Sequence, residues 1–284
     1  MRWAIASILA LVGLVAVAED REAASRAPAT PVLEMRLAES GWGTASRADV
    51  RAVLTSAGRQ LLVHFPGAKL EPLEVRPAGG PITLFKRAAD GAIVIKLNTR
   101  DTYWAQYAFQ FGHELCHVLC RFDEGDRGNL WFEESICEVA SLYVLRSMAD
   151  EWQTRPPYLN WRSFAPKLTE YADKRLAERK LPEGTSLETW YHAEAAALRA
   201  DPVNRDRNRI VAGALLAMFE KSPQHWAAVA YLNQQKPSGP QTFEAYLQNW
   251  HDRAPTVHRG FIEGLAQEFG IALKIRVDES RPQR

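Results

Sequence analysis

The chain's first regular hydrophobic pattern is helical. Between residues 50 and 62, apolar side chains recur at a spacing of three to four positions, which places them on one face of a helix. They are Val50, Val53, Leu54, Ala57, Leu61 and Leu62. The segment Ser46–Asp49 lies just before them and is typical of a capping box. Phe65-Pro66-Gly67 follows, and its proline and glycine predict the end of the helix.

The hydrophobic pattern changes between residues 70 and 100, where short apolar runs predict strands. The runs are Leu73–Val75, Ile82–Phe85 and Ala92–Leu97, and prolines and glycines separate them. Asp90-Gly91 lies between the second and third runs and indicates a hairpin. The third run is rich in β-branched residues and is the strongest strand prediction.

Two long apolar runs then predict a pair of helices. The first, Tyr103–Phe122, follows the last strand directly, and a polar loop over residues 123–129 separates it from the second, Leu130–Leu145. Candidate caps for the first helix are Asn98, Thr99 and Asp101. The second helix carries Glu134 and Glu138 one turn apart among apolar residues. A core helix rarely places two carboxylates there without a polar or charged partner.

Helical patterns continue to the end of the chain. The expected helices are Phe164–Leu176, Leu187–Arg199, Arg207–Lys221, Pro223–Asn233, Phe243–His251 and Val257–Phe269. Ser222-Pro223 is typical of a helix start. The predicted fold class is therefore α+β and mostly helical, with a small N-terminal sheet packed on the helix at 103–122. We expect a first lobe over residues 41–150, a helical C-terminal lobe over residues 151–276 and a tail at residues 277–284.

The N-terminus has the pattern of a secretory signal peptide. Arg2 precedes an uncharged apolar stretch, Ala4–Ala18, and Ala16-Val17-Ala18 fits a cleavage site. The stretch is shorter than the ~20 residues that a spanning helix needs. We expect residues 1–18 to be removed, residues 19–40 to form a flexible leader, and the mature protein to be secreted or periplasmic without stable membrane insertion.

Charge and length narrow the range of functions. Removing residues 1–18 would take away Arg2 alone, which leaves 34 basic against 34 acidic residues and a net charge of about zero. Such a balance does not favour binding to nucleic acid or to an anionic membrane surface. A chain of 284 residues, 46% of them hydrophobic, is long enough to bury a substantial core.

One motif within the helix at 103–122 indicates metal chemistry. His113 and His117 are four residues apart, so both imidazoles stand on the same helix face and can bind one ion. Glu114 lies beside them and can reach a water on that ion. This is the His-Glu-x-x-His arrangement of zinc hydrolases, in which the glutamate is the general base. The alternative is that both histidines are ordinary core residues.

A catalytic zinc ion usually has three protein ligands. Glu134 is the natural third ligand, because it lies on the next helix, across a loop long enough to let the two helices pack antiparallel. Its neighbour Glu133 is the alternative. The sequence therefore predicts a Zn²⁺ site made of His113, His117 and Glu134.

Residues 90–145 resemble the gluzincin zinc peptidases, in which a His-Glu-x-x-His helix is followed by a Trp-x-x-Glu-Gly motif. The chain has Trp131-Phe132-Glu133-Glu134-Ser135, with serine in place of the usual glycine. The resemblance implies a zincin-like fold and makes Glu134 the ligand. It also places Glu138 where relatives have a carboxylate that accepts a hydrogen bond from a ligand histidine, which would fix the tautomer of His113.

The resemblance further implies a peptidase acting on peptide or protein substrates, which bind along the edge of strand Ile93–Leu97. Together with the signal-peptide pattern, it predicts an exported zinc-dependent peptidase. Ile210 stands where related aminopeptidases have a tyrosine that stabilises the oxyanion. Isoleucine cannot take that role, and the candidates for it in this chain are Tyr191, His192 and Arg209. Two rival functions are a non-catalytic zinc-binding protein with a degenerate peptidase site and a hydrolase of peptide cross-links in the bacterial cell wall.

The chain has three cysteines: Cys116, Cys120 and Cys137. In an oxidising compartment an odd number leaves at least one thiol free. Cys137 could form a disulfide with Cys120 or with Cys116, which would join the two helices expected to meet at the metal. The alternative is three buried free thiols.

Overall fold

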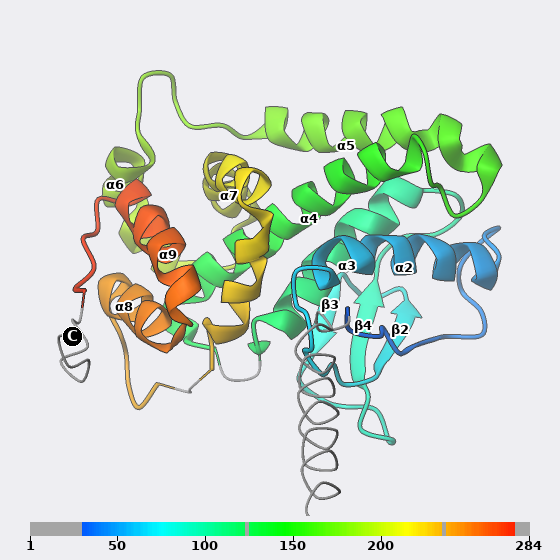
Figure 1. The fold of residues 1–284 in the computed structure, drawn as a ribbon, viewed down its shortest axis with the longest axis horizontal. Helices are drawn as coiled ribbons and strands as arrows, with labels where there is room; N and C mark the ends of the chain where they lie inside the picture. Colours follow the sequence, from blue (N-terminus) through cyan, green and yellow to red (C-terminus); the bar gives the residue numbers. More distant parts are fainter. Residues whose placement is uncertain (1–29, 123–124, 235–236, 276–284) are drawn as a thin grey trace, which may run out of the picture.

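The three predicted strands belong to one small mixed sheet. The computed structural model describes residues 30–122, 125–234 and 237–275 (Figure 1). Its strand order is β1-β2-β4-β3. The three predicted strands are β2 (Leu73–Pro77), β3 (Ile82–Leu84) and β4 (Ile93–Leu97).

The pairing of β4 decides which edges of the sheet are free. β4 is parallel to β2 on one side and antiparallel to β3 on the other, and the hairpin predicted at Asp90-Gly91 joins β3 to β4. Because both sides of β4 are paired, its predicted role as the substrate-binding edge is wrong. The free edges belong to β3 and β1.

The first strand, β1 (Met35–Leu37), corrects the expected flexible leader at residues 19–40. It pairs with β2 in the parallel sense, with Met35 opposite Leu73, and the side chains of Met35 and Leu37 are buried. Three residues are too few for a period-of-two pattern to be recognised in sequence. Residues 19–29 and the predicted signal peptide at residues 1–18 lie outside the described residues.

Two helices lie beside the sheet, and the second of them is the helix on which the sheet was expected to pack (Figure 1). They are α2 (Arg47–Leu62), whose N-cap Ser46 accepts a hydrogen bond from the Asp49 backbone at 3.0 Å, and α3 (Trp104–Leu119). The predicted caps of α3 are wrong, since its N-cap is Tyr103 and no side chain caps it. Asp101 instead accepts a hydrogen bond from the Thr44 backbone at 2.8 Å.

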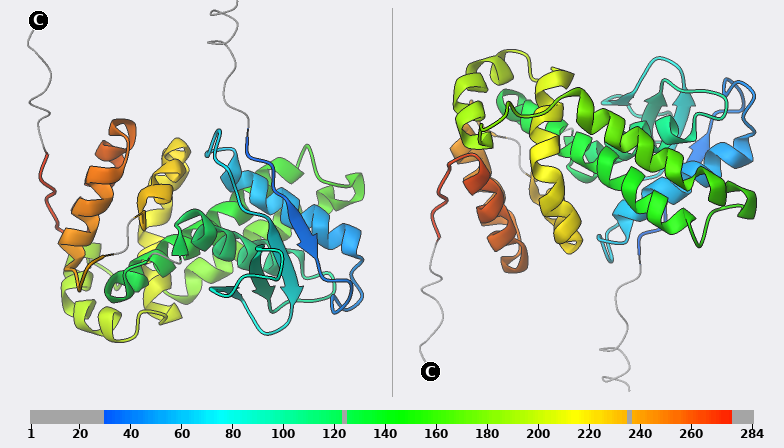
Figure 2. Two further views of the ribbon diagram at one scale, coloured as in Figure 1. Left: turned by 90° about the horizontal axis from the view of Figure 1, so that it is seen from below. Right: turned by 90° about the horizontal axis from the view of Figure 1, so that it is seen from above.

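The longest helix, α4 (Leu130–Trp152), connects the sheet side of the molecule to the C-terminal helices (Figures 1 and 2). Near its start, the Trp131 ring packs against Phe243, with ring centroids 4.6 Å apart. At its end, the Trp152 indole donates a hydrogen bond to Ser56 Oγ of α2 at 2.8 Å. The lobe boundary expected at residue 150 therefore lies within α4, and one hydrophobic core includes residues from both sides of it.

The remaining described elements are helical, and the fold is α+β and mostly helical, as predicted. They are η3 (Leu159–Phe164), α5 (Ala165–Glu178), α6 (Leu187–Ala200), α7 (Arg205–Lys221), η4 (Pro223–Tyr231), α8 (Phe243–Arg253) and α9 (Thr256–Glu268). A short turn, η2 (Arg127–Asn129), precedes α4. The segment after Ser222-Pro223 forms a 3₁₀ helix instead of the expected α-helix. The tail predicted at residues 277–284 lies outside the described residues.

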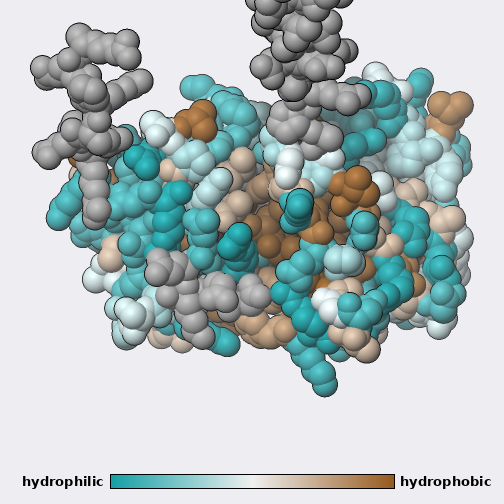
Figure 3. Space-filling view, turned by 60° about the horizontal axis from the view of Figure 1, so that its bottom comes forward, coloured by the Kyte–Doolittle hydropathy of each residue, from teal (hydrophilic) through white to brown (hydrophobic). Residues whose placement is uncertain are grey.

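The face shown in Figure 3 is largely hydrophilic, with hydrophobic residues gathered in a recessed area near its middle. Within the part of the chain that the structure describes, no helix has the length and apolar character needed to cross a membrane.

Candidate metal centre

The close approach of α3 and α4 brings the predicted ligands together. Gly112 lies at this contact, and a Cβ atom added to it would be 3.2 Å from Val144 Cγ2 of α4. His113 and His117 stand next to it on α3, and Glu134 faces them from α4. One potential ligand atom from each of these three residues lies within 4.8 Å of the others. The three side chains could therefore hold a metal ion.

Both histidines turn the same ring nitrogen toward Glu134. The distance from His113 Nε2 to Glu134 Oε2 is 3.2 Å, and that from His117 Nε2 to Glu134 Oε1 is 3.7 Å. The two rings are close, with centroids 4.9 Å apart. Two imidazole nitrogens and a carboxylate that face one another form a donor set that suits zinc.

The opposite nitrogen of each ring contacts another carboxylate of α4. His117 Nδ1 is 2.7 Å from Glu133 Oε1 and donates a hydrogen bond to it. His113 Nδ1 is 3.6 Å from Glu138 Oε2, a longer contact than a hydrogen bond. Glu138 Oε1 instead accepts from Arg209 Nε at 3.2 Å. Glu133 therefore contacts the back of His117, while Glu134 faces both histidines.

Glu133 is held in turn by residues of the C-terminal part of the chain. Asn233 Nδ2 donates to Glu133 Oε2 at 2.7 Å, and the Tyr246 hydroxyl donates to Asn233 Oδ1 at 2.8 Å. All three side chains are buried. Sequence reasoning missed Asn233 and Tyr246, because they lie about a hundred positions away from Glu133 and match no motif.

The electrostatics of the centre favour positive charge. Burial by itself lowers the pKa of His113, but its contacts with Glu134 and Glu138 outweigh this and raise the pKa to about 10. For His117, burial lowers the pKa, and the hydrogen bond to Glu133 raises it to about 9. Burial raises the pKa of Glu134, but the hydrogen bond from His113 and the neighbouring positive charges hold it below its usual value. A bound cation would satisfy the same carboxylates.

Glu114 lies in the cleft that opens onto these ligands. The cleft has a volume of about 510 Å³ and is lined by residues of β3, α3, α4, α5 and α7. Glu114 is only 3% exposed, and Thr83 Oγ1 of β3 donates a hydrogen bond to its Oε2 at 2.8 Å. Sequence reasoning missed Thr83, which lies in an ordinary strand pattern.

Of the three candidate oxyanion donors, only Arg209 is among the described residues that line the cleft. Arg209 lines the cleft, but its guanidinium contacts Glu138 and Glu178. Tyr191 packs on Trp131 with ring centroids 5.7 Å apart, and neither Tyr191 nor His192 is among the described residues that line the cleft. Other polar side chains, outside these three candidates, also line it: Tyr171, Arg175 and Arg205.

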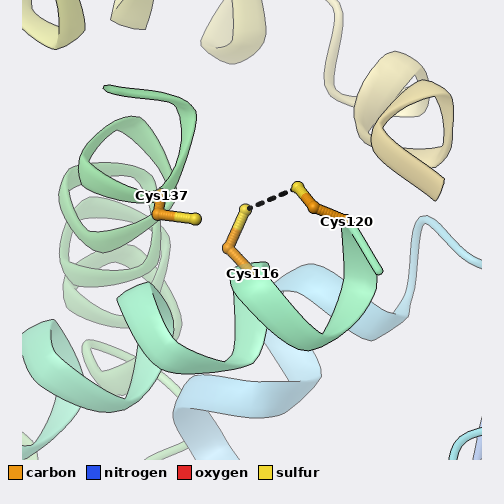
Figure 4. Close-up of side chains that lie close together, drawn as sticks. All are labelled: Cys116, Cys120 and Cys137. Carbon is orange, nitrogen blue, oxygen red and sulfur yellow. Dashed lines mark hydrogen bonds between the residues drawn. The ribbon is translucent and has the colours of Figure 1, made fainter. Parts of the chain in front are cut away.

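The three cysteines are buried free thiols, which is one of the two alternatives left open by the sequence. They converge between α3 and α4, and Cys116 Sγ lies 3.9 Å from Cys120 Sγ (Figure 4). The disulfide from Cys137 to Cys120 or Cys116 is not formed.

Comparisons of the chain with protein-family models, with curated proteins and with solved structures found no match. The chemistry of the site therefore rests on its own residues.

Proposed function

We propose that this protein is an exported zinc-dependent peptidase of the gluzincin type. The observation that supports the proposal best is the convergence of His113, His117 and Glu134 at a cleft that also contains the Glu114 carboxylate. A zinc site with a purely structural role needs no general base. The export part of the proposal rests on the signal-peptide pattern of residues 1–18.

Zinc fits the donor set of this site. Two imidazole nitrogens and one carboxylate are a common ligand set of catalytic zinc, which keeps a further position for water or substrate. When bound, the ion polarises a water molecule and lowers its pKa toward neutrality. Glu133 accepts a hydrogen bond from His117 Nδ1 and would hold the Nε2 atom of this ring toward the ion, whereas Glu138 lies 3.6 Å from His113 Nδ1 without a hydrogen bond.

Glu114 is the proposed general base. It would take a proton from the attacking water and deliver it to the leaving amine of the peptide. The hydrogen bond from Thr83 holds one oxygen of the Glu114 carboxylate against β3. Thr83 is therefore proposed as a positioning residue, whose hydroxyl fixes the Glu114 carboxylate and does not contact the reacting atoms of the substrate.

The proposed substrate is an extended peptide paired with the free edge of β3. Ile82 and Thr83 of this strand line the cleft, so a peptide added there would pass in front of Glu114. Aromatic side chains lie along the same cleft and offer apolar contacts to substrate side chains: Phe85, Phe109, Phe122 and Tyr171. A peptide fits these features, because its backbone pairs with a strand while its side chains occupy pockets.

The test compares wild-type protein with Glu114→Gln on a mixed peptide library, with zinc measured in both proteins. Glu114→Gln should keep its zinc and lose hydrolysis by about 10²–10⁴-fold, the usual contribution of a general base. Glu244→Gln is the matched control, because Glu244 is exposed on α8 and should not affect activity. Equal activity of Glu114→Gln and wild type would contradict the mechanism.

The rival of a non-catalytic zinc-binding protein has some support from Ser135 and Ile210, which depart from the peptidase pattern. It predicts zinc in the wild-type protein and no hydrolysis of the library by the wild type or by Glu114→Gln. Adding cell-wall peptide fragments to the same assay distinguishes a protein substrate from a wall cross-link.

A further inference from the structure

We propose that Cys116, Cys120 and Cys137 form a second metal site, which binds copper(I) through three sulfur atoms. These are all the cysteines of the chain, and they meet at one point although they come from two helices. In a chain so poor in cysteine, such a convergence calls for an explanation beyond the filling of apolar space.

The geometry of the three thiols suits a single ion. Cys116 lies in the last turn of α3, Cys120 is the C-cap residue of this helix, and Cys137 faces them from α4 (Figure 4). The three Sγ atoms lie within 4.8 Å of one another, and all three residues are fully buried. The sulfur atoms point toward a shared space, so an ion between them would need only small side-chain rotations.

The polar surroundings of the thiols are sparse. Cys116 Sγ contacts Cys120 Sγ and the Ile136 carbonyl oxygen, each at 3.9 Å. Little free energy is lost when these weak contacts are replaced by bonds to a metal ion. Among the described residues, no histidine, carboxylate or further cysteine joins the group as a fourth ligand.

These features select the kind of ion. Soft thiolate ligands favour copper(I), zinc and iron–sulfur clusters. A closed structural zinc site needs four ligands, whereas copper(I) is stable with three sulfur ligands. Binding forms copper–sulfur bonds and releases thiol protons to the solvent, and the copper stays copper(I), so no oxidant or reductant is consumed.

The cysteine site and the histidine site lie on the same pair of helices, at neighbouring positions of the chain. Cys116 directly precedes His117, and Cys137 directly precedes Glu138. A copper(I) ion would therefore tie α3 to α4 next to the zinc ligands. The two donor sets differ in softness, so each ion should occupy its own site.

The test is a titration of the fully reduced mature protein with copper(I) under anaerobic conditions, in competition with a copper(I) chelator. We expect one tightly bound copper(I) per chain, an ultraviolet sulfur-to-copper charge-transfer band, and X-ray absorption showing three sulfur neighbours. The melting temperature of the protein should rise on binding.

Variants separate this site from the zinc site. Cys137→Ala should lose the tight copper(I) and the charge-transfer band while keeping zinc, whereas His117→Ala should lose zinc and keep copper(I). Ser147→Ala, further along α4, is the matched control. If Cys137→Ala does not fold, Cys120→Ala is measured in its place, with the same expected loss of copper(I). Copper(I) bound equally well by folded cysteine variants, or no tight binding by reduced wild type, would overturn the proposal.

Discussion

Each candidate ligand histidine is contacted by carboxylates on both of its ring nitrogens. For His117, Glu133 lies at Nδ1 and Glu134 at Nε2, and for His113 the corresponding residues are Glu138 and Glu134. The hydrogen bond from His117 Nδ1 to Glu133 fixes the tautomer that leaves Nε2 of this ring free to bind metal. The residues behind the ligands should therefore matter for metal affinity nearly as much as the ligands.

We expect Glu133→Gln to weaken zinc binding by about 10–100-fold, because the neutral amide no longer increases the basicity of His117. Competition with a zinc chelator measures this change. Glu263→Gln is the control, since Glu263 makes a similar contact with His251 Nε2 at 2.8 Å, away from the proposed zinc ligands. An unchanged zinc affinity in Glu133→Gln would show that this contact does not tune the site.

At Thr83, removal of one hydroxyl should slow the reaction without removing the metal. Thr83→Val keeps the shape of the side chain but loses the hydrogen bond to Glu114, so kcat/KM should fall by about 10–100-fold. Thr83→Ser should restore most of the activity, because it restores the hydroxyl. A similar loss in both variants would indicate a packing effect instead.

At the scale of elements, the site depends on how closely α3 and α4 approach each other. Gly112 permits this approach at the position directly before His113, and the added Cβ would also be 3.5 Å from the Ala140 carbonyl oxygen of α4. A larger residue there should separate the helices and move His113 and His117 away from Glu134.

Gly112→Val should lower the free energy of unfolding by about 1–3 kcal/mol through overpacking and should also weaken zinc binding. Urea denaturation and chelator competition measure the two effects. Gly260→Val is the matched control, because Gly260 is an exposed helical glycine of α9 whose added Cβ would meet nothing within 4 Å. Wild-type stability and zinc affinity in Gly112→Val would refute this account of the helix contact.

At the scale of the whole molecule, the C-terminal half both supports the site and carries its own pH dependence. Asn233 and Tyr246 connect it to Glu133, as described above. Further from the site, His225 Nδ1 lies 3.1 Å from His258 Nδ1, a contact between η4 and α9. Two protonated imidazoles at that distance would repel each other, so at least one must be neutral.

Burial lowers the pKa of both His225 and His258 below 6.5, and for His258 the charge of His225 lowers it further. Since the unfolded chain then binds protons more readily, the stabilisation is complete above pH 6.5 and is lost as the pH falls through the lowered pKa values. His64, whose pKa burial also lowers, acts in the same direction.

These histidines should contribute a decrease in the free energy of unfolding between about pH 7 and pH 5, which His113 and His117 oppose because their raised pKa values favour the folded state at lower pH. In the double variant His225→Gln/His258→Gln, this decrease should become smaller, as measured by urea denaturation at each pH. His192→Gln, at an exposed position of α6, is the control and should keep the wild-type slope. An identical slope in the double variant would contradict the assignment.

Residues close together in sequence account for most of what was predicted correctly. The periodicity of Val50–Leu62, the cap at Ser46 and the strands at 73–75, 82–85 and 92–97 depend on local preferences. Failures came where a local signal was short or competed with packing, as at β1, at the cap of α3 and at η4. The hydrogen bond from His117 Nδ1 to Glu133 was also not predicted, because the sequence suggested Glu133 only as an alternative metal ligand.

The sequence by itself determined that His113 and His117 share one helix face with Glu114 beside them, since four-residue spacing on a helix leaves no other arrangement. Only the tertiary structure decided that β3 is a free edge of the sheet, that Thr83 reaches Glu114, and that Asn233 holds Glu133. It also decided that all three cysteines meet. The physical reason is that these contacts join residues far apart in the chain, whose positions depend on how the helices and the sheet pack and not on local conformational preference.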